Sequence, residues 1–326
     1  MHISEINIYP IKSLKRISLD CADVEARGLK LDRRWVLTDA KGDFLTQREM
    51  PKMATICVAL NGNGVVASDG NTSIAIDPLT EGEREMVQVW GSESEALAYD
   101  KDINRWFSQA LDTEVRLYYM PEDAGRPLNP RFDRGGELLS FADGYPLMLI
   151  GAASLRELNE RIADSLVKPE MRSGRGEEIS AESSGLVSRR VTITPPAEPG
   201  THPKQGEKFL REPLLMDRFR PNLVVEGCRA FAEDSWRRIM IGNVVFRTTK
   251  PCVRCVMTTV DQATGEFTGK EPLRTLASFR LAKDIFPSDL DRLGLSPNGV
   301  LFGQNLVPET HGAVINVGDE IEILGE

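Results

Sequence analysis

The sequence has very few histidines, and they do not form pairs. His2, His202 and His311 are the three histidines in 326 residues, and no two of them lie three to five residues apart. A structural zinc site needs four cysteine or histidine ligands, usually as two close pairs, and only Cys252 and Cys255 form such a pair. The sequence therefore argues against a zinc centre.

Long apolar runs and disulfide-like cysteine spacings are also missing. The most apolar stretch, residues 145–153, is too short to span a bilayer. The first residues have neither the basic nor the apolar region of a signal peptide. The five cysteines are an odd number without the spacing of a disulfide scaffold. These absences predict a cytoplasmic protein without a membrane span.

Positive charge is in deficit. The formal net charge is -9 and the pI is near 5.2, which argues against nucleic acid as a structural partner. The chain is 41% hydrophobic and 27% charged, as globular proteins are, and it is long enough for about two domains. Any anion that this protein binds must therefore meet a local cluster of lysine and arginine side chains.

Most of the predicted elements are short strands joined by hairpins. An amphipathic helix is expected at residues 102–111, with Asp102 as its N-cap, and a second helix begins with a capping box at Ser154. The pattern predicts a β-rich α+β fold with a closed or half-closed barrel and a smaller α/β part. Strand patterns occur within residues 3–67, 115–120, 145–150 and 239–247, and residues 313–324 are expected to form a final hairpin.

The composition changes at two places along the chain. Residues 121–136 are rich in Pro, Gly, Arg and Asp, which predicts a boundary between domains at 1–122 and 123–326. Residues 165–215 are rich in Gly, Ser, Glu, Arg and Pro, and we expect a long flexible insertion there. A G-x-G-x-x-A pattern at residues 62–67 lies in a hairpin and not before a helix, so it is interpreted as a turn.

The residues most typical of chemistry are two cysteines in a basic loop. Cys252 and Cys255 alternate with Lys250 and Arg254, and neighbouring cations favour the thiolate that binds metals. The β-branched run at 256–260 predicts a strand immediately after the loop. A thioredoxin-like pair would begin a helix, and an iron–sulfur cluster needs four ligands. The spacing alone leaves open that these are two inert cysteines at a strand end.

Basic residues recur at predicted strand ends and turns of this acidic chain. Any one of them is best explained as solvated surface. If several converged beside a thiolate, they would form a site for a phosphorylated ligand, because arginine matches phosphate bidentately. A single soft thiolate also suits a metal that the ligand itself brings. The residues concerned are Lys12, Ser13, Arg33, Arg34, Arg218, Arg220 and Arg254.

Seven short motifs follow one another along nearly the whole chain. They are Tyr-Pro-Ile-Lys-Ser13, Gly-Leu-Lys-Leu-Asp-Arg-Arg-Trp35, Arg-Phe-Arg-Pro-Asn222, Glu-Asp-Ser-Trp236, Lys-Pro-Cys-Val-Arg-Cys255, Thr-Thr-Val-Asp261 and Leu-Phe-Gly-Gln304. In this order they resemble the MOSC family with its N-terminal MOSC_N region. The resemblance is closest to bacterial proteins related to the mitochondrial amidoxime reducing component. Residues 165–215 make this chain longer than the family leads us to expect.

The resemblance implies a MOSC β-barrel with flanking helices, a smaller N-terminal α/β MOSC_N part, and a mononuclear molybdenum cofactor with a pterin dithiolene. By similarity, Cys255 would be the catalytic metal ligand, and Cys252 would be its neighbour. Stronger matches to positions that hold the pterin and its phosphate are Lys12, Ser13, Arg33, Arg220, Asn222 and Arg254. Weaker matches, where contact through the backbone is expected, are Gly144, Tyr145, Val253 and Asn305.

The implied activity is the two-electron reduction of N-hydroxylated compounds, namely amidoximes, hydroxylamines and N-hydroxylated base analogues. No haem, ferredoxin or dinucleotide pattern occurs in the chain, so we expect the electrons to come from a separate protein, such as a ferredoxin, a flavin reductase or a cytochrome b5-like protein. Two alternatives remain open. One is a sulfur-transfer protein that carries a persulfide on Cys255 or Cys252, and the other is a carrier of the molybdenum cofactor.

Overall fold

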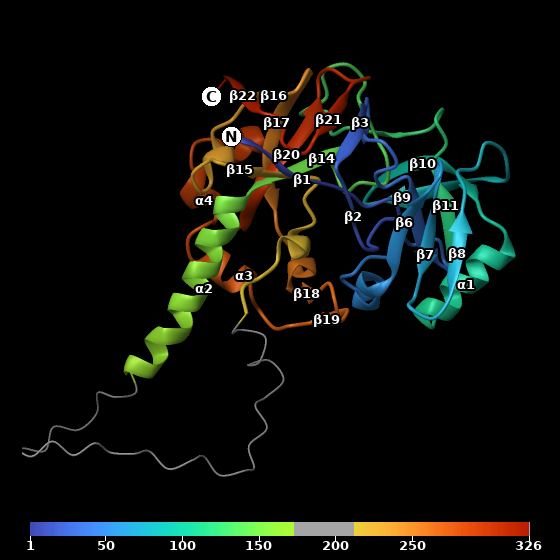
Figure 1. The fold of residues 1–326 in the computed structure, drawn as a ribbon, viewed down its shortest axis with the longest axis horizontal. Coiled ribbons are helices and arrows are strands. Elements are labelled where there is room, and N and C mark those ends of the chain that lie inside the picture. Colours follow the sequence, from blue (N-terminus) through green and yellow to red (C-terminus); the bar gives the residue numbers. More distant parts are fainter. Residues whose placement is uncertain (173–211, 326) are drawn as a thin grey trace, which may run out of the picture.

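The structure is a computed structural model that describes residues 1–172 and 212–325. Of the insertion predicted at 165–215, residues 173–211 lie outside the described residues. Helix α2 (Ala152–Arg172) already occupies the first part of that range. Figure 1 shows α2 beside the large sheet and extending beyond it, with the N-terminal sheets on the opposite side of the molecule.

The fold is built around an eight-stranded sheet that forms a half-barrel. Neighbouring strands of this sheet form seven pairs. Six of the pairs are antiparallel, and only β14 and β15 run parallel to each other. Near the open side, Ile321 N donates to Met1 O at 3.1 Å. The strand order is β2 (Ile17–Leu19), β1 (His2–Ile8), β15 (Leu223–Glu226), β14 (Leu147–Gly151), β20 (Leu301–Pro308), β17 (Val244–Val253), β16 (Arg238–Ile241) and β22 (Ile321–Gly325).

A β-bulge lets the first strand bury its isoleucines on one face. Ile3 and Ile6 are three residues apart, so a regular strand would point them to opposite faces. The pairing with β15 shifts between Ile3 and Glu5, and both Ile3 and Ile6 are fully buried. Ser4 donates its hydroxyl to Val224 O at 3.2 Å at this irregularity. The bulge therefore aligns β1 with the hydrophobic core.

The centre of the large sheet is buried on both faces. Successive residues of β14 alternate between two hydrophobic clusters: Leu147 and Leu149 pack in one, and Met148 and Ile150 pack in the other. Helix α2 covers the second cluster, which includes its Leu158. Burial on both faces explains why β14 is a continuous apolar run and does not alternate with polar residues.

The N-terminal part contains two further sheets and one long helix. Trp35 is fully buried in its core and donates its indole N–H to Tyr99 at 2.8 Å. Asp100, and not Asp102 as predicted, caps the helix by accepting hydrogen bonds from Asp102 N and Ile103 N. The elements are β5 (Trp35–Asp39), β11 (Val115–Tyr119), β10 (Ser92–Ala98) and β9 (Arg84–Val89) in one sheet, β6 (Cys57–Asn61), β7 (Gly64–Ser68) and β8 (Ser73–Ile76) in the other, and α1 (Lys101–Leu111).

Short elements complete the described part of the chain. They are β21 (Val314–Asn316), β3 (Cys21–Glu25), β4 (Gly28–Leu29), β12 (Arg126–Pro127), β13 (Leu138–Leu139), β18 (Val260–Asp261), β19 (Glu266–Phe267), α3 (Leu273–Ala277), α4 (Ala282–Ile285), α5 (Leu290–Leu293), and the 3-10 turns η1 (Pro51–Thr55), η3 (Met216–Phe219), η4 (Ala232–Asp234) and η5 (Val256–Thr259). The fold is thus β-rich α+β with few helices.

Two local predictions were wrong. The strands within 313–324 do not form a hairpin, because β21 pairs with β3 and β22 pairs with β16. Ser154 does not cap α2, which begins two residues earlier. Its hydroxyl instead donates to the buried carboxyl of Glu233 at 2.8 Å and accepts from Phe231 N. In both cases a partner distant in sequence replaces the local one.

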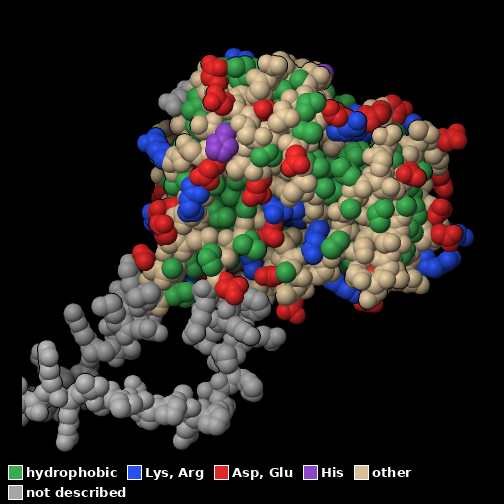
Figure 2. Space-filling model, in the orientation of Figure 1, with side chains coloured by type: hydrophobic (Ala, Val, Ile, Leu, Met, Phe, Trp, Pro, Cys, Tyr) green, Lys and Arg blue, Asp and Glu red, His purple; other side chains and the backbone are tan. Residues whose placement is uncertain are grey.

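The surface and the helices bear on possible partners. On the face shown in Figure 2, acidic and basic side chains are interspersed and do not form one continuous basic surface. Within residues 1–172 and 212–325, no helix is both long and apolar enough to cross a membrane.

Strands β1 and β2 belong to the large sheet although they lie at the start of the chain. The division at residue 122 stays a prediction.

Candidate functional site

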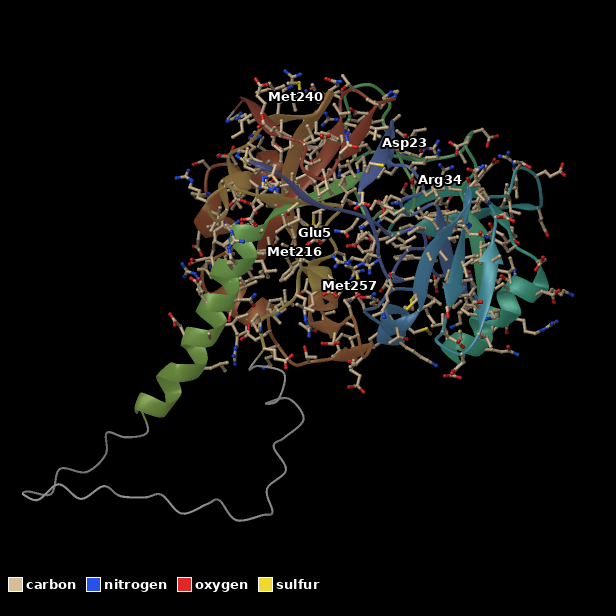
Figure 3. The ribbon with its side chains drawn as sticks, viewed as in Figure 1. Glu5, Asp23, Arg34, Met216, Met240 and Met257 are labelled. Carbon is tan, nitrogen blue, oxygen red and sulfur yellow. The ribbon has the colours of Figure 1, made fainter. Side chains whose placement is uncertain are left out.

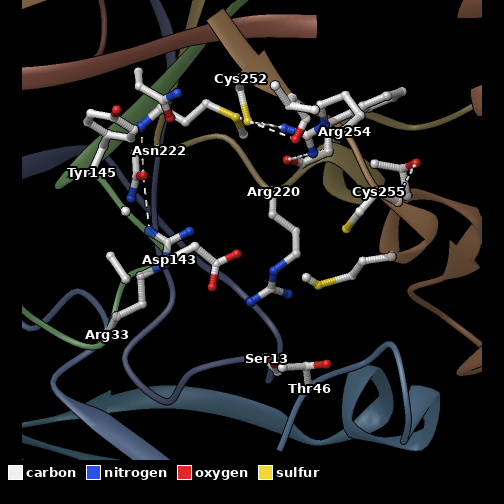
Figure 4. A pocket seen from close by; sticks show the side chains of 18 of the residues that line it. Ser13, Arg33, Thr46, Asp143, Tyr145, Arg220, Asn222, Cys252, Arg254 and Cys255 are labelled. Carbon is white, nitrogen blue, oxygen red and sulfur yellow. Dashed lines mark hydrogen bonds between the residues drawn. The ribbon is translucent and has the colours of Figure 1, made fainter. Parts of the chain in front are cut away.

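A pocket lies where β1 ends, β14 and β15 begin, and the N-terminal sheets meet the large sheet (Figure 4). Met257, which lines it, lies near the middle of the molecule in Figure 3. The pocket brings together all of the residues that the resemblance singled out, although they come from six separate stretches of the chain. These are Lys12, Ser13, Arg33, Gly144, Tyr145, Arg220, Asn222, Val253, Arg254, Cys255 and Asn305.

The cysteine pair lies at the end of a strand and does not begin one. The strand predicted at 256–260 is wrong for residues 256–259, which form η5, and only Val260 belongs to a strand, β18. Cys252 is the penultimate residue of β17, and Cys255 is the N-cap of the 3-10 turn η5. The hydroxyl of Thr258 donates to Cys255 O at 3.0 Å, and that of Thr259 donates to Val256 O at 2.8 Å. Such local bonds from threonine compete with strand pairing, and here they hold the turn.

The two thiols point to different partners (Figure 4). Cys252 Sγ lies 3.0 Å from Arg254 Nη1, which also lies 2.8 Å from Met148 Sδ. Cys255 Sγ accepts instead from Arg48 Nε at 3.2 Å. Each sulfur therefore has its own arginine, and the two cysteines have separate environments despite their close spacing in sequence.

Two arginines of the pocket contact the same aromatic ring. The guanidinium of Arg33 lies 4.5 Å from the ring centroid of Tyr9, and that of Arg220 lies 4.2 Å from it. Tyr9 is itself buried, which raises its pKa to about 12, and its hydroxyl donates to Pro221 O at 3.1 Å. Cation–π contacts of this kind stabilise each guanidinium by about 1–2 kcal/mol where water is excluded.

Three residues of the pocket adopt left-handed backbone conformations although none is glycine. The φ angles of Ser13, Arg33 and Arg220 are 69°, 51° and 55°. This conformation costs an L-residue roughly 1–2 kcal/mol and is often found at functional sites. Arg220 reaches it as the C-cap of η3, which turns the side chain back toward Tyr9. The turns thus orient side chains toward the pocket at an energetic cost.

Lys12, which is buried, forms an ion pair at one wall with Asp143, whose side chain is about half exposed. Lys12 also donates to Phe141 O at 2.9 Å, and burial lowers its pKa to about 8. For Asp143, burial favours the neutral form, but the charge of Lys12 and hydrogen bonds from Lys12 and Trp90 outweigh it and hold the pKa well below its usual range. This pair leaves little net charge of its own.

Asn222 fixes Arg33 within the pocket. Its amide oxygen accepts from Arg33 Nη1 at 3.0 Å and from Met148 N at 3.2 Å, and its amide nitrogen donates to Asn7 O and Asp32 Oδ2, each at 3.1 Å. All these bonds join separate elements. The side chain therefore connects β1, β14 and β15 at the sheet end, and it positions the Arg33 guanidinium beside Asp32.

The four weaker matches differ in character. A side chain at Gly144 would meet open space, which agrees with a position of backbone contact. Tyr145 packs edge-on against Phe132, while Val253 is 43% exposed at the rim. Asn305 is nearly buried and donates its amide to Lys250 O at 3.1 Å. These four residues form walls of the pocket and contribute no charged side chain to it.

The pocket carries more positive than negative charge. Lys12, Arg33 and Arg218 each have a carboxylate partner, whereas Arg220 and Arg254 form no ion pair with a described carboxylate. The nearest hydrogen bond of Arg220 is to Gln262 Oε1 at 3.5 Å, so most of its five donors lack an acceptor within the described residues. Burial lowers its pKa from 12.5 to about 10. These residues fit an anionic ligand with a phosphate group.

The chemistry of the donor set also fits a soft metal carried by that ligand. The described residues contain no group of three or more His, Cys, Asp or Glu side chains placed to hold a metal ion. The thiol of Cys255 lines the pocket among the cations, as does Ser13, a residue only 3% exposed. A single thiolate is a suitable protein ligand for a metal whose other ligands come from a cofactor.

Sequence reasoning missed one residue that contacts the candidate metal ligand. Arg48 donates to Cys255, stacks on Trp90 at 4.4 Å and lines the pocket. It lies in a loop after β5 with no motif or periodicity around it. Thr46 and Met148 also line the pocket without having been assigned to it, whereas Arg218 was among the basic residues considered for such a site. For Arg48, the signal was at most its position in a short polar loop, Thr46-Gln47-Arg48.

Comparison with known protein families defines the class of protein. Residues 1–114 match the MOSC N-terminal beta barrel domain, and residues 200–322 match the MOSC domain. The two domains occur in the order that the sequence motifs indicated. The chain therefore belongs to the MOSC family, with both its N-terminal and its main domain.

Individual relatives extend the match over the full length. The chain is 28% identical over 99% of its length to mitochondrial amidoxime-reducing component 1 of Homo sapiens, of which it covers 83%. It is 28% identical over 98% of its length to mitochondrial amidoxime reducing component 2 of Bos taurus, of which it covers 82%. It is thus a distant full-length homologue of these components. A third relative is molybdenum cofactor sulfurase of Oryza sativa subsp. japonica, at 28% identity over 87% of this chain and 31% of the sulfurase.

Proposed function

We propose that this protein is a molybdenum-cofactor-dependent reductase of N-hydroxylated compounds that takes its electrons from a separate protein. The observation that carries the proposal is the pocket: Arg220, which is buried, and Arg254, which is half-buried, form no ion pair with a described carboxylate and line the same pocket as the Cys255 thiol. Full-length homology to amidoxime-reducing components supports the substrate class. Amidoximes, hydroxylamines and N-hydroxylated base analogues are the compounds to test.

The residues of the pocket divide into three roles under this proposal. Cys255 would be the protein ligand of molybdenum. The cations and hydrogen-bonding side chains would hold the pterin and its phosphate, with Arg220 and Arg254 supplying the charge that the protein does not neutralise. The bound cofactor would supply the two-electron redox chemistry, and the protein would fix its orientation and exclude water. The cofactor-holding residues are Lys12, Ser13, Arg33, Arg220, Asn222 and Arg254, and the remaining walls are Gly144, Tyr145, Val253 and Asn305.

The electron donor and the location are further parts of the proposal. The sequence has no haem, ferredoxin or dinucleotide motif, which is why we assign electron delivery to an external ferredoxin, flavin reductase or cytochrome b5-like protein. A cytoplasmic location is also proposed, because the five cysteines lack the spacing of a disulfide scaffold and a reducing compartment suits them. The assay below does not require either to be known, because a chemical reductant replaces the partner.

Activity should be measured on protein purified from a host that makes the cofactor, with reduced methyl viologen as the electron source. An amidoxime and an N-hydroxylated base are supplied as substrates, and the amidine or free base is measured as the product. We expect product with wild type and none above background with Cys255→Ser. Cys252→Ser should retain most of the activity. Wild-type protein that contains metal and pterin, yet reduces none of these compounds, would contradict the proposed activity.

The homology to molybdenum cofactor sulfurase supports a second candidate, sulfur transfer through a cysteine persulfide. Cys252 packs against the hydrophobic cluster under α2, and its sulfur lies 3.0 Å from Arg254 Nη1, which could stabilise such a group. Cyanide releases thiocyanate from persulfides, so thiocyanate equal in amount to the protein would favour this candidate. Thiocyanate at background level together with N-reduction would favour the reductase.

A further inference from the structure

One arginine connects the two domains directly at the candidate metal ligand. Arg48 and Cys255 are 207 residues apart in the sequence, yet Arg48 Nε lies 3.2 Å from Cys255 Sγ. The cysteine belongs to the turn after β17 of the large sheet, while Arg48 belongs to the loop after β5 of the N-terminal part. The sulfur is therefore held from both sides of the pocket.

The guanidinium of Arg48 is fixed on its other sides as well. It lies 4.4 Å from the ring centroid of Trp90, and its Nη2 is 3.7 Å from Asp143 Oδ2. Trp90 donates its indole N–H to the other oxygen of Asp143 at 3.1 Å. Trp90 and Asp143 thus form a clamp, the Trp90–Asp143 clamp, that orients the plane of the guanidinium and directs Nε toward the sulfur.

Trp90 does not belong to any of the hydrophobic clusters of the described residues. It lies at the turn between β9 and β10, is 51% exposed, and has a φ of 59°. Such turns favour Asn or Gly, and a left-handed conformation costs another residue roughly 1–2 kcal/mol. Its contacts are with Arg48, Asp143 and the edge of Phe44 at 5.0 Å. A large aromatic side chain kept at this cost indicates a functional constraint.

Arg48 also has unused donor capacity. Its Nη1 is buried and has no hydrogen-bond partner among the described residues. Its side chain is only 20% exposed, so water compensates little for this loss. The Arg48 guanidinium therefore donates one hydrogen bond to a thiol, a weak acceptor, and leaves a second buried donor without an acceptor among the described residues. Both features are expected of a group arranged around a ligand sulfur.

We propose that Arg48 is a positioning residue that holds the Cys255 sulfur as a metal ligand and tunes it through an N–H···S hydrogen bond, with the Trp90–Asp143 clamp fixing its orientation. This inference rests on the proposed function, because it assigns Arg48 a role toward the bound molybdenum. A donor to a ligand sulfur withdraws electron density and so favours the reduced metal. Removing it should lower the reduction potential.

The test compares purified holoenzymes of wild type, Arg48→Gln, Arg48→Lys and Trp90→Phe. Arg105→Gln is the matched control, because Arg105 is an exposed arginine of the N-terminal part that pairs only with nearby Asp102. Molybdenum and pterin content are measured first. The Mo(V) electron paramagnetic resonance spectrum and a redox titration then report on the sulfur–metal bond, which a purely structural role would not change.

We expect pterin content within about twofold of wild type in every variant. In Arg48→Gln the Mo(V) spectrum should change and the reduction potential should fall, with Arg48→Lys restoring part of the shift and Trp90→Phe producing a smaller one. Wild-type spectrum and potential in Arg48→Gln would overturn the inference while leaving the proposed function intact. Folded wild-type protein without molybdenum would overturn both, and the wild-type sample alone reveals that case.

Discussion

Replacing Arg220 by methionine should have opposite effects on stability and on cofactor binding. The guanidinium is 7% exposed, and burial lowers its pKa from 12.5 to about 10. One pKa unit corresponds to about 1.4 kcal/mol, so charged Arg220 destabilises the folded apoprotein by roughly 3 kcal/mol. The stacking on Tyr9 at 4.2 Å offsets about 1–2 kcal/mol of this. The net penalty is therefore about 1–2 kcal/mol.

The sign of the effect follows from the direction of the pKa change. Because the folded-state pKa is lower than the unfolded-state value, the penalty is fully present below pH 10 and disappears only as the unfolded arginine also loses its proton. At pH 7, Arg220→Met keeps a long side chain against Tyr9 and removes the charge. We expect the free energy of unfolding of the apoprotein to rise by about 1–2 kcal/mol, measured by urea denaturation.

The same substitution should weaken the binding of the cofactor. A hydrogen bond to a charged group contributes about 1.5–3 kcal/mol, which corresponds to roughly tenfold to a hundredfold in affinity. Pterin occupancy after purification should fall accordingly, while Arg105→Met, on an exposed helix face, should match wild type in both measurements. An apoprotein variant less stable than wild type, with undiminished pterin occupancy, would refute the reasoning, because Arg220 would then serve the fold and not the ligand.

Two further predictions concern the charge of Lys12 and the packing of β20 at Gly303. Burial lowers the pKa of Lys12 to about 8, and only protonated Lys12 attracts an anion, so the affinity of the apoprotein for sulfate should fall about tenfold or more between pH 7 and pH 9.5. A flat profile in Lys12→Met would confirm the assignment, and the same fall in that variant would contradict it. In β20, an added methyl group at Gly303 would lie 2.7 Å from Ile150 Cγ1 and 2.8 Å from Leu149 O, with φ at 83°. Gly303→Ala should lower the free energy of unfolding by about 2–4 kcal/mol. Gly312→Ala, at an open site with φ at 84°, should lower it by only about 1–2 kcal/mol. Equal losses in urea denaturation would show that packing at Gly303 contributes nothing.

The residues named by the resemblance all line one pocket, whereas the local structure around them was predicted less well. Basic residues at turns, together with the ordered motifs, indicated a single site, and the turns do converge at one end of the large sheet. Residues 256–259 were wrongly predicted as part of a strand because the threonine hydroxyls donate to Cys255 O and Val256 O, hydrogen bonds that β propensity does not describe. Propensity reports preferences of single residues, and here the local hydrogen bonds decided the conformation.

Other features depend on contacts between distant segments, which no single-sequence pattern contains. Residues 313–324 have a turn between two apolar runs, but the strands find their partners in β3 and β16. Arg48 became visible as part of the site only when the fold placed it 3.2 Å from Cys255. The same holds for Trp90, which sequence alone shows only as an aromatic residue before a glycine. Long-range pairing, and not composition, determined these positions.

The most direct test of the account is the molybdenum and pterin content of purified wild type, Cys255→Ser and Cys252→Ser from a host that makes the cofactor. We predict nearly one molybdenum and one pterin per wild-type chain, loss of molybdenum in Cys255→Ser, and a milder change in Cys252→Ser, whose sulfur faces Arg254. Loss of molybdenum in Cys252→Ser, with retention in Cys255→Ser, would show that Cys252 and not Cys255 is the metal ligand. Wild-type protein that folds but holds neither molybdenum nor pterin would contradict the central claim.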